Sequence, residues 1–189
     1  MTISGSGASV DLATASIVNE LLQRIEALEF GVPRTIFLTS QTYTGNLGGL
    51  TGADAICQGL ADAAGLAGNF KAWLSDSTDS PSSRFSPNGR PIMRVDGALV
   101  AEDWSDLTDG TLSSSIQFSE TGANIGGANV WTNTGSEGKA FSSTNHCDNW
   151  TSDSSAMNVR VGVSFATASN WTAANTVSCD GTFRLYCLN

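Results

Sequence analysis

The first cysteine of the chain ends the segment Gly49-Leu-Thr-Gly-Ala-Asp-Ala-Ile-Cys57. A second motif, Cys147-Asp-Asn-Trp150, opens on another cysteine, and the last cysteine lies in Leu185-Tyr-Cys-Leu-Asn189. Cys179 lies between them. An even number of cysteines in a Gly- and Ser-rich chain of 189 residues predicts two disulfides and an oxidising, extracellular setting. Four cysteines permit three connectivities, and their pattern alone does not choose between them.

Ordered motifs around these cysteines resemble the endostatin domain at the C-terminus of certain animal collagens. They are more similar still to a family of secreted bacterial domains of unassigned function. The resemblance covers residues 35–189, and several motifs in a consistent order make it more specific than any single motif. It depends on residues 49–57, Ala64-Gly-Leu-Ala-Gly-Asn-Phe-Lys-Ala-Trp-Leu-Ser75, Pro91-Ile-Met-Arg-Val-Asp-Gly-Ala-Leu-Val100 with Trp104, Val130-Trp131, and residues 147–150 and 185–189.

This resemblance implies an α+β, C-type-lectin-like fold with nested disulfides, Cys57–Cys187 outside and Cys147–Cys179 inside. Its functional part does not transfer. Animal endostatins bind heparin through arginine clusters and hold zinc through N-terminal histidines. This chain has nine Lys and Arg against 18 Asp and Glu, and one histidine. A net charge of −9 repels a sulfated polysaccharide. The Glu-Pro-Asn calcium motif of sugar-binding C-type lectins is also absent.

Composition excludes several classes of protein. The length predicts one domain, residues 31–189, with a short appendage, residues 1–30. Only 14% of the residues are charged, which is typical of a loop-rich secreted domain. We expect no membrane insertion, because no apolar run approaches the roughly 18 residues of a membrane span. We expect no nucleic-acid partner, because phosphate contacts need a basic patch and none is evident.

The first residues, Met1-Thr-Ile-Ser-Gly-Ser-Gly, have neither the positive start nor the apolar run of a secretory signal peptide. Three explanations reconcile this with disulfides. A signal was removed, the protein is exported by another route, or it belongs to a virion whose thiols oxidise after lysis. We favour the first and third, and expect an extracellular or virion-surface location.

Residues 12–29 contain no Gly or Pro and predict a helix. Its apolar residues follow the 3-4-3 spacing of coiled-coil a and d positions. An isolated helix this short is marginal in water, so the stripe must pack on something. It either folds back on its own domain or, as we favour, oligomerises. The residue types favour a dimer, but the collagen-linked relatives are trimers, so we expect a homotrimer. The four oligomerisation residues are Val18, Leu21, Ile25 and Leu28.

The domain itself shows alternating strand patterns and one helix. Thr51 is the expected N-cap of this helix, with Asp54 in the capping-box position, and Gly65 ends it. Asp96-Gly97 predicts a type I′ hairpin between residues 92–95 and 98–100. Trp104 and Leu107 indicate a short helical turn. The other expected strands are residues 35–39, 70–74, 116–118, 130–132, 159–163 and 183–188.

We expect no enzymatic activity. The only histidine, His146, is expected to be a surface residue at a strand end, and no Gly-x-Ser-x-Gly elbow is present. No spacing places two carboxylates together for glycoside hydrolysis. One histidine cannot anchor zinc. No cofactor or metal is therefore expected, with calcium alone left open. Its weak candidates are Asp103, Asp106 and Asp109, Asp76 with Asp79, and Asp148 with Asp153.

Four of the five tryptophans lie in the shared motifs and are expected in the core. Trp171, in a less patterned stretch, is the one candidate for an exposed sugar-stacking ring. The long polar loops 132–145 and 151–170 are the expected binding face. Within these loops, and in the motif between them, we expect five ligand-binding residues: Asn133, Glu137, Asn145, Asp148 and Asn149.

These patterns favour a non-catalytic recognition head, expected to be trimeric, on an adhesin or a phage fibre. It would bind a cell-surface glycan or protein, with avidity raising the apparent affinity of weak single sites. The alternative is a structural protein that caps or assembles a fibre or virion and has no ligand of its own.

Overall fold

The structure is a computed structural model that describes residues 14, 16–22 and 31–189. The chain divides into two compact units, Met1–Val32 and Pro33–Asn189. In the first unit, residues 14 and 16–22 are helical, as predicted, whereas Ile25 and Leu28 lie outside the described residues. Four apolar side chains of this helix are 48–57% exposed, namely Ile17, Val18, Leu21 and Leu22.

The second unit is an α+β domain built on one mixed sheet of eight strands, in the order β4-β3-β1-β8-β5-β6-β7, with β2 also paired to β8. Most neighbouring strands are antiparallel, but β1–β3 and β5–β8 are parallel. The strands are β1 (Arg34–Leu38), β2 (Lys71–Ala72), β3 (Ile92–Arg94), β4 (Leu99–Ala101), β5 (Asn129–Trp131), β6 (Asn158–Val163), β7 (Asn175–Ser178) and β8 (Arg184–Leu188).

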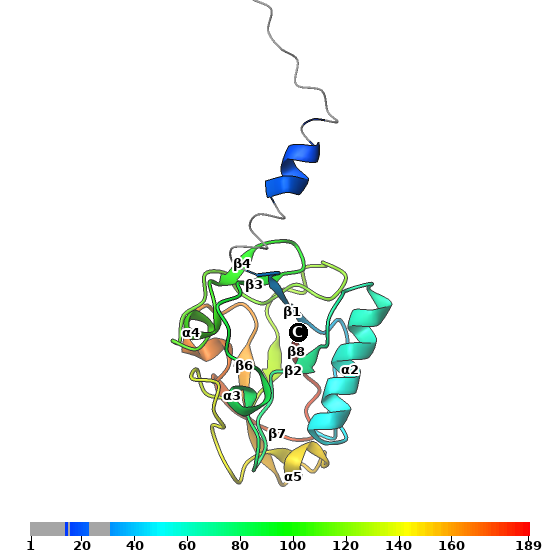
Figure 1. Cartoon of the computed structure of the whole chain (residues 1–189). Coiled ribbons are helices and arrows are strands. Elements are labelled where there is room, and N and C mark those ends of the chain that lie inside the picture. The colour runs from blue at the N-terminus through cyan, green and yellow to red at the C-terminus, as the bar shows by residue number, and fades with distance from the viewer. Residues whose placement is uncertain (1–13, 15, 23–30) are drawn as a thin grey trace, which may run out of the picture. The chain divides into compact units, whose positions relative to one another are not determined.

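The helices are short apart from α2, which lies beside the sheet (Figure 1). They are α2 (Gly49–Ala63), α3 (Pro81–Arg84), α4 (Trp104–Leu107), α5 (Cys147–Trp150) and the 3-10 turn η1 (Ser169–Trp171). Within the described residues, no helix is long and apolar enough to cross a membrane.

The central strands bury both of their faces. Successive side chains of a strand point to opposite sides, so one strand can supply two cores. In β1, Phe37 belongs to one hydrophobic cluster, and Ile36 and Leu38 belong to the other. In β8, Cys187 and Tyr186 are divided in the same way. The first cluster also holds the buried face of α2: Ala53, Cys57 and Ala61.

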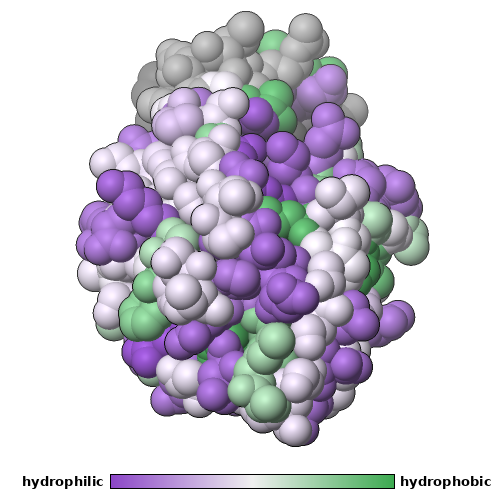
Figure 2. Space-filling model, turned by 90° about the horizontal axis from the view of Figure 1, so that it is seen from below, coloured by the Kyte–Doolittle hydropathy of each residue, from purple (hydrophilic) through white to green (hydrophobic). Residues whose placement is uncertain are grey.

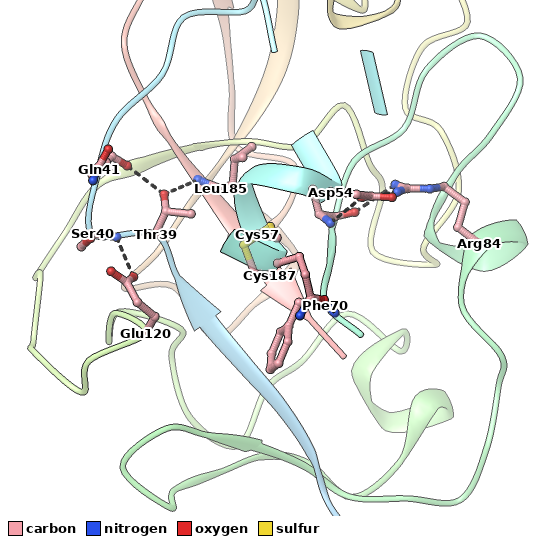
Figure 3. The surroundings of a disulfide bond; sticks show 12 residues. Thr39, Ser40, Gln41, Asp54, Cys57, Phe70, Arg84, Glu120, Leu185 and Cys187 are labelled. Atoms are coloured by element: carbon pink, nitrogen blue, oxygen red, sulfur yellow. Dashed lines mark hydrogen bonds and ion pairs between the residues drawn. A yellow bond between two sulfur atoms is a disulfide. The ribbon is translucent and has the colours of Figure 1, made fainter. Parts of the chain in front are cut away.

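The predicted capping box of α2 is wrong. The helix begins after Gly48, whose φ of 76° is left-handed, and no side chain caps it. Asp54 instead accepts a hydrogen bond from the Ala72 main chain and pairs with Arg84 (Figure 3). The carboxylate therefore ties the helix to β2 and α3 rather than closing its first turn.

The predicted hairpin is present, but its turn is not type I′. Only Gly97 has a positive φ, 84°, and Asp96 does not. The Gly97 N–H donates to Arg94 and the Arg94 N–H donates to Ala98, which is a type I turn followed by a glycine bulge. The strand expected at 116–118 is reduced to an isolated bridge at Phe118, and β7 was not predicted.

The two disulfides are Cys57–Cys187 and Cys147–Cys179, the nested pairing that the resemblance implies. Their Cα atoms are 5.4 and 5.7 Å apart, within the usual range for such bonds. The first joins α2 to the central strand β8, and the second joins α5 to the end of β7. Two disulfides indicate an oxidising, extracellular setting.

Candidate recognition site

The most strained backbone in the described chain lies in α5. Four consecutive non-glycine residues have positive φ angles, 52° at Cys147, 52° at Asp148, 54° at Asn149 and 63° at Trp150. The ψ angles of Asp148 and Asn149 are 56° and 40°, so this is a turn of left-handed helix. That conformation costs about 1–2 kcal/mol per residue. Strain of this kind persists only where the surroundings impose it, and it is concentrated at functional sites.

Both ends of this left-handed turn are anchored in the core. Cys147 and Trp150 are both buried. The disulfide anchors Cys147, and Trp150 is anchored by a hydrogen bond from its Nε1 to the Ser75 carbonyl at 2.9 Å. The Trp150 ring lies edge-on to Trp131, with centroids 5.9 Å apart. The middle residues differ, because Asp148 is exposed and Asn149 is half-buried. The fold therefore presents a polar pair on a rigid, strained support.

His146 holds the turn from inside and corrects our expectation of a surface residue. It is only 9% exposed. Its Nδ1 accepts a hydrogen bond from the Asn149 N–H at 2.8 Å, and its Nε2 lies 3.1 Å from the Ser143 carbonyl. This pattern places the proton on Nε2 and leaves Nδ1 as an acceptor. With both nitrogens engaged, the only histidine of the chain is a cap.

A hollow of about 260 Å³ opens beside the left-handed turn. Asn145 and Asp148, both predicted as ligand-binding and close together in the sequence, line one side of it, and residues 156–158 line the other. Its polar groups are amides, a hydroxyl and a carboxylate, which suit hydrogen bonds to a neutral polar ligand. The lining includes Thr144, Asn145, His146, Asp148, Met157 and Asn158. Thr144, His146, Met157 and Asn158 were not among the predicted site residues.

Asn133 does not belong to this surface, which corrects its predicted role. It is fully buried, with a φ of 46°. Its side-chain amide donates to the carbonyls of Ser75 and Ser142, and its Oδ1 accepts from the Ser142 N–H. The residue holds two loops together from within. Glu137 is exposed, but it does not line the hollow.

A second loop supports the turn from the side. The Asn149 Oδ1 accepts a hydrogen bond from the Ser77 N–H at 3.1 Å. The neighbouring Asp76 closes this loop by accepting from the N–H groups of Thr78 and Asp79 at 2.8 and 2.7 Å. Burial acts to raise the pKa of Asp76, but the hydrogen bonds from Asp79 and Thr78 outweigh it and lower that pKa.

The tryptophans do not provide a sugar-stacking platform. Trp171, the predicted exposed ring, is fully buried and packs on Trp73 and Tyr186 at centroid distances of 5.1 and 5.5 Å. Trp73, Trp131 and Trp150 are also fully buried, which confirms their predicted place in the core, whereas Trp104 is half-buried and packs against it. No tryptophan ring therefore lines the hollow for a sugar to stack on.

Three of the acids proposed for calcium, those in and around α4, serve the local backbone. Asp103 caps α4 by accepting from the Asp106 N–H, Asp106 accepts from the Glu102 N–H, and Asp109 accepts from the Thr111 N–H. Over the described ranges, no three His, Cys, Asp or Glu side chains gather in a way that could hold a metal ion.

The face around the turn is mostly hydrophilic or neutral. Figure 2 views the side of the domain on which α5 and β7 lie in Figure 1, and its apolar residues form small, separate patches. Comparison with protein-family models gives no match for this chain, and comparison with curated proteins gives none either. Any function must therefore be argued from the site itself.

Proposed function

We propose that this chain is a non-catalytic extracellular recognition domain with an endostatin-like, C-type-lectin-like fold. It binds a cell-surface glycan or protein at the hollow beside α5, as the head of an adhesin or phage fibre. The nested disulfides and the mixed sheet support the fold assignment.

The observation that carries the proposal is the left-handed turn. Holding four non-glycine residues in that conformation costs several kcal/mol, at about 1–2 kcal/mol each. The disulfide, the buried Trp150 and the His146 cap hold it in place. The result is an exposed carboxylate, that of Asp148, held at a polar hollow before any ligand arrives, while the neighbouring Asn149 side chain does not line the hollow and accepts from Ser77. Such preorganisation lowers the entropic cost of binding.

The polar groups favour recognition over catalysis. The single histidine is engaged at both ring nitrogens, so it is not placed to serve as a general base. Amide, hydroxyl and carboxylate groups line the hollow, and they match the hydroxyl groups of a sugar or the polar backbone of a peptide. Single sites of this size are weak, so assembly into a homotrimer, or a dimer, would supply avidity.

A glycan array with the full-length protein tests this proposal, run with calcium and again with a chelator. We expect binding that persists in the chelator and that weakens in the variants Asn145→Ala and Asp148→Asn. The matched controls are Asn124→Ala and Asp62→Asn, which alter exposed residues outside the hollow and outside the loops of the expected binding face. Equal loss in the controls contradicts the proposed site, and loss of binding in the chelator alone establishes calcium as a cofactor.

One observation favours the structural alternative, in which the protein caps or assembles a fibre or virion. The N-terminal helix exposes four apolar side chains, and such a stripe needs a partner. Deleting residues 1–30 separates the two functions. A recognition head without these residues keeps its monovalent ligand affinity, and light scattering shows only that its mass has fallen to that of a monomer. A purely structural piece fails to assemble and binds no glycan before or after the deletion.

A further inference from the structure

A second hollow, of about 270 Å³, collects much of the positive charge of this acidic protein. Four of the nine Lys and Arg residues of the chain line it, whereas the chain as a whole carries a net charge of −9. Three side-chain amides, those of Asn69, Asn88 and Asn189, lie among them. The charged and amide side chains considered below as ligand-binding groups are those of Arg34, Lys71, Arg84, Arg90, Asn69 and Asn88. None of them lines the hollow beside α5.

Arg34 is the unusual member of this group. It is the first residue of β1 and is only 4% exposed. Its Nη1 is buried and has no hydrogen-bond partner in the described structure. Its Nε donates to the main-chain oxygen of Asn189. The guanidinium carbon lies 5.3 Å from the Phe85 ring centroid and 5.8 Å from that of Trp104. The aromatic rings hold the cation in place but do not neutralise it.

The surroundings of Arg34 disfavour its positive charge. Burial, and then the positive charge of Arg90, lower the pKa of Arg34 to about 10. A buried donor without a partner loses its bonds to water and gains nothing in return. Since the guanidinium remains protonated at neutral pH, its Nη1 is a charged donor that can form a strong hydrogen bond to a negatively charged oxygen.

The protein supplies little negative charge here. Arg84 pairs with Asp54 and also donates to the carbonyls of Ala72 and Leu74, so its charge is already shared. Lys71 donates through Nζ to the Arg84 carbonyl. Among the residues that the structure describes, neither Arg34 nor Lys71 forms an ion pair with an Asp or Glu side chain.

We propose that this hollow is a binding site for an oxyanion, the carboxylate or phosphate group of a small ligand. Arg34 offers its guanidinium edge and Lys71 its ammonium group, while the amides of Asn69 and Asn88 bind the polar remainder. The volume lies near the lower limit of small-molecule pockets, so it suits one compact group rather than a polymer. The site is independent of the recognition face beside α5.

Nuclear magnetic resonance titrations of the full-length protein test this site, at constant ionic strength. The probes are acetate, inorganic phosphate and acetamide, the last being a neutral molecule of nearly the same shape as acetate. We expect saturable shifts of the Arg34 Nε–H signal and of the Lys71 and Asn88 amides with the anions, and none with acetamide. A stronger response to acetate identifies a carboxylate ligand, and a stronger response to phosphate identifies a phosphate ester.

Three variants complete the test. Arg34→Gln and Lys71→Gln should each weaken anion binding about tenfold or more, because each removes a charge-assisted hydrogen bond. Lys71→Gln keeps the test valid if Arg34→Gln fails to fold. Lys139→Gln removes the same charge from an exposed loop position outside the hollow and should change nothing. Equal responses to acetamide and acetate, or equal weakening by Lys139→Gln, would overturn the proposal.

Discussion

The two disulfides stabilise regions of opposite character. Cys57–Cys187 joins a regular right-handed helix of 15 residues to the central strand, and both of its cysteines are fully buried (Figure 3). Cys147–Cys179 joins a strained left-handed turn to the edge strand of the sheet. In the first region the local conformation is favourable and the bond adds to a core. In the second the local conformation is unfavourable and the bond imposes it. The same chemistry therefore maintains the fold in one place and a surface geometry in the other.

The largest effect should come from the outer bond. Replacing both cysteines, Cys57→Ser with Cys187→Ser, should lower the free energy of unfolding by about 5 kcal/mol, because the bond closes a loop with a sequence separation of 130. Urea denaturation followed by tryptophan fluorescence measures this loss. If the double variant is as stable as the parent, the bond does not hold the core.

Breaking the inner bond should cost less stability but more function. The Cys147–Cys179 bond closes a loop with a sequence separation of 32. Replacing both cysteines by serine should therefore lower the free energy of unfolding by about 3–4 kcal/mol. Hydrogen exchange should accelerate in the amides around Trp150 while those of α2 remain protected. Uniform acceleration across both regions would mean that the two disulfides stabilise one cooperative unit rather than two separate regions.

Glycine substitutions should act with opposite sign in the two regions. Asp148→Gly should stabilise the protein by up to about 1 kcal/mol, because glycine adopts a positive φ without strain. The matched change Ala55→Gly, at an exposed position of α2, should destabilise it by about 0.5–1 kcal/mol. Thermal unfolding of both variants checks the signs. If both variants lose stability, α5 is not strained as described.

The smallest effect is a pH dependence of the loop that supports the turn. Hydrogen bonds lower the pKa of Asp76, so its contribution to stability is present above the unfolded-state pKa of about 3.9 and is lost as the pH falls through the folded-state value. Asp76→Ala should therefore cost up to about 1 kcal/mol at neutral pH and progressively less below about pH 4. The urea unfolding midpoints of the parent and the variant, measured between neutral pH and about pH 3, give this difference in stability. The control is Asp153→Ala, at an exposed position. A difference that does not change with pH contradicts this role of the Asp76 carboxylate.

Regular elements were predictable from the sequence because their side chains repeat. The apolar face of α2 follows a helical period, residues 70–74 alternate, β1 has the composition of a strand, and the Asp-Gly pair marks a turn. The disulfide pairing came from the resemblance, since the cysteine count left three connectivities open. β7 was missed because Asn175-Thr-Val-Ser178 is polar and half-exposed at the sheet edge, so no apolar alternation marks it.

The site was harder to predict because it depends on tertiary contacts. Nothing periodic marks a left-handed turn, and its only local signal is the Asp148-Asn149 pair, since these residue types tolerate positive φ best. Asn133 was chosen as a polar loop residue, but the loops close over it and use all three of its hydrogen bonds. Asp54 was expected to cap its own helix, but its partner, Arg84, lies far along the chain.

The position of β8 in the sheet sets the order in which this domain can fold. The last strand of the domain lies at the centre, bonded to β1 on one side and to β2 and β5 on the other. Neither half of the sheet can join the other until that strand arrives, and such long-range pairing is slow. Cys147 and Cys179 are able to meet earlier, because they are close in sequence. The native disulfide between Cys57 and Cys187 can therefore form only after β8 has reached α2, so this bond is expected to form late in folding.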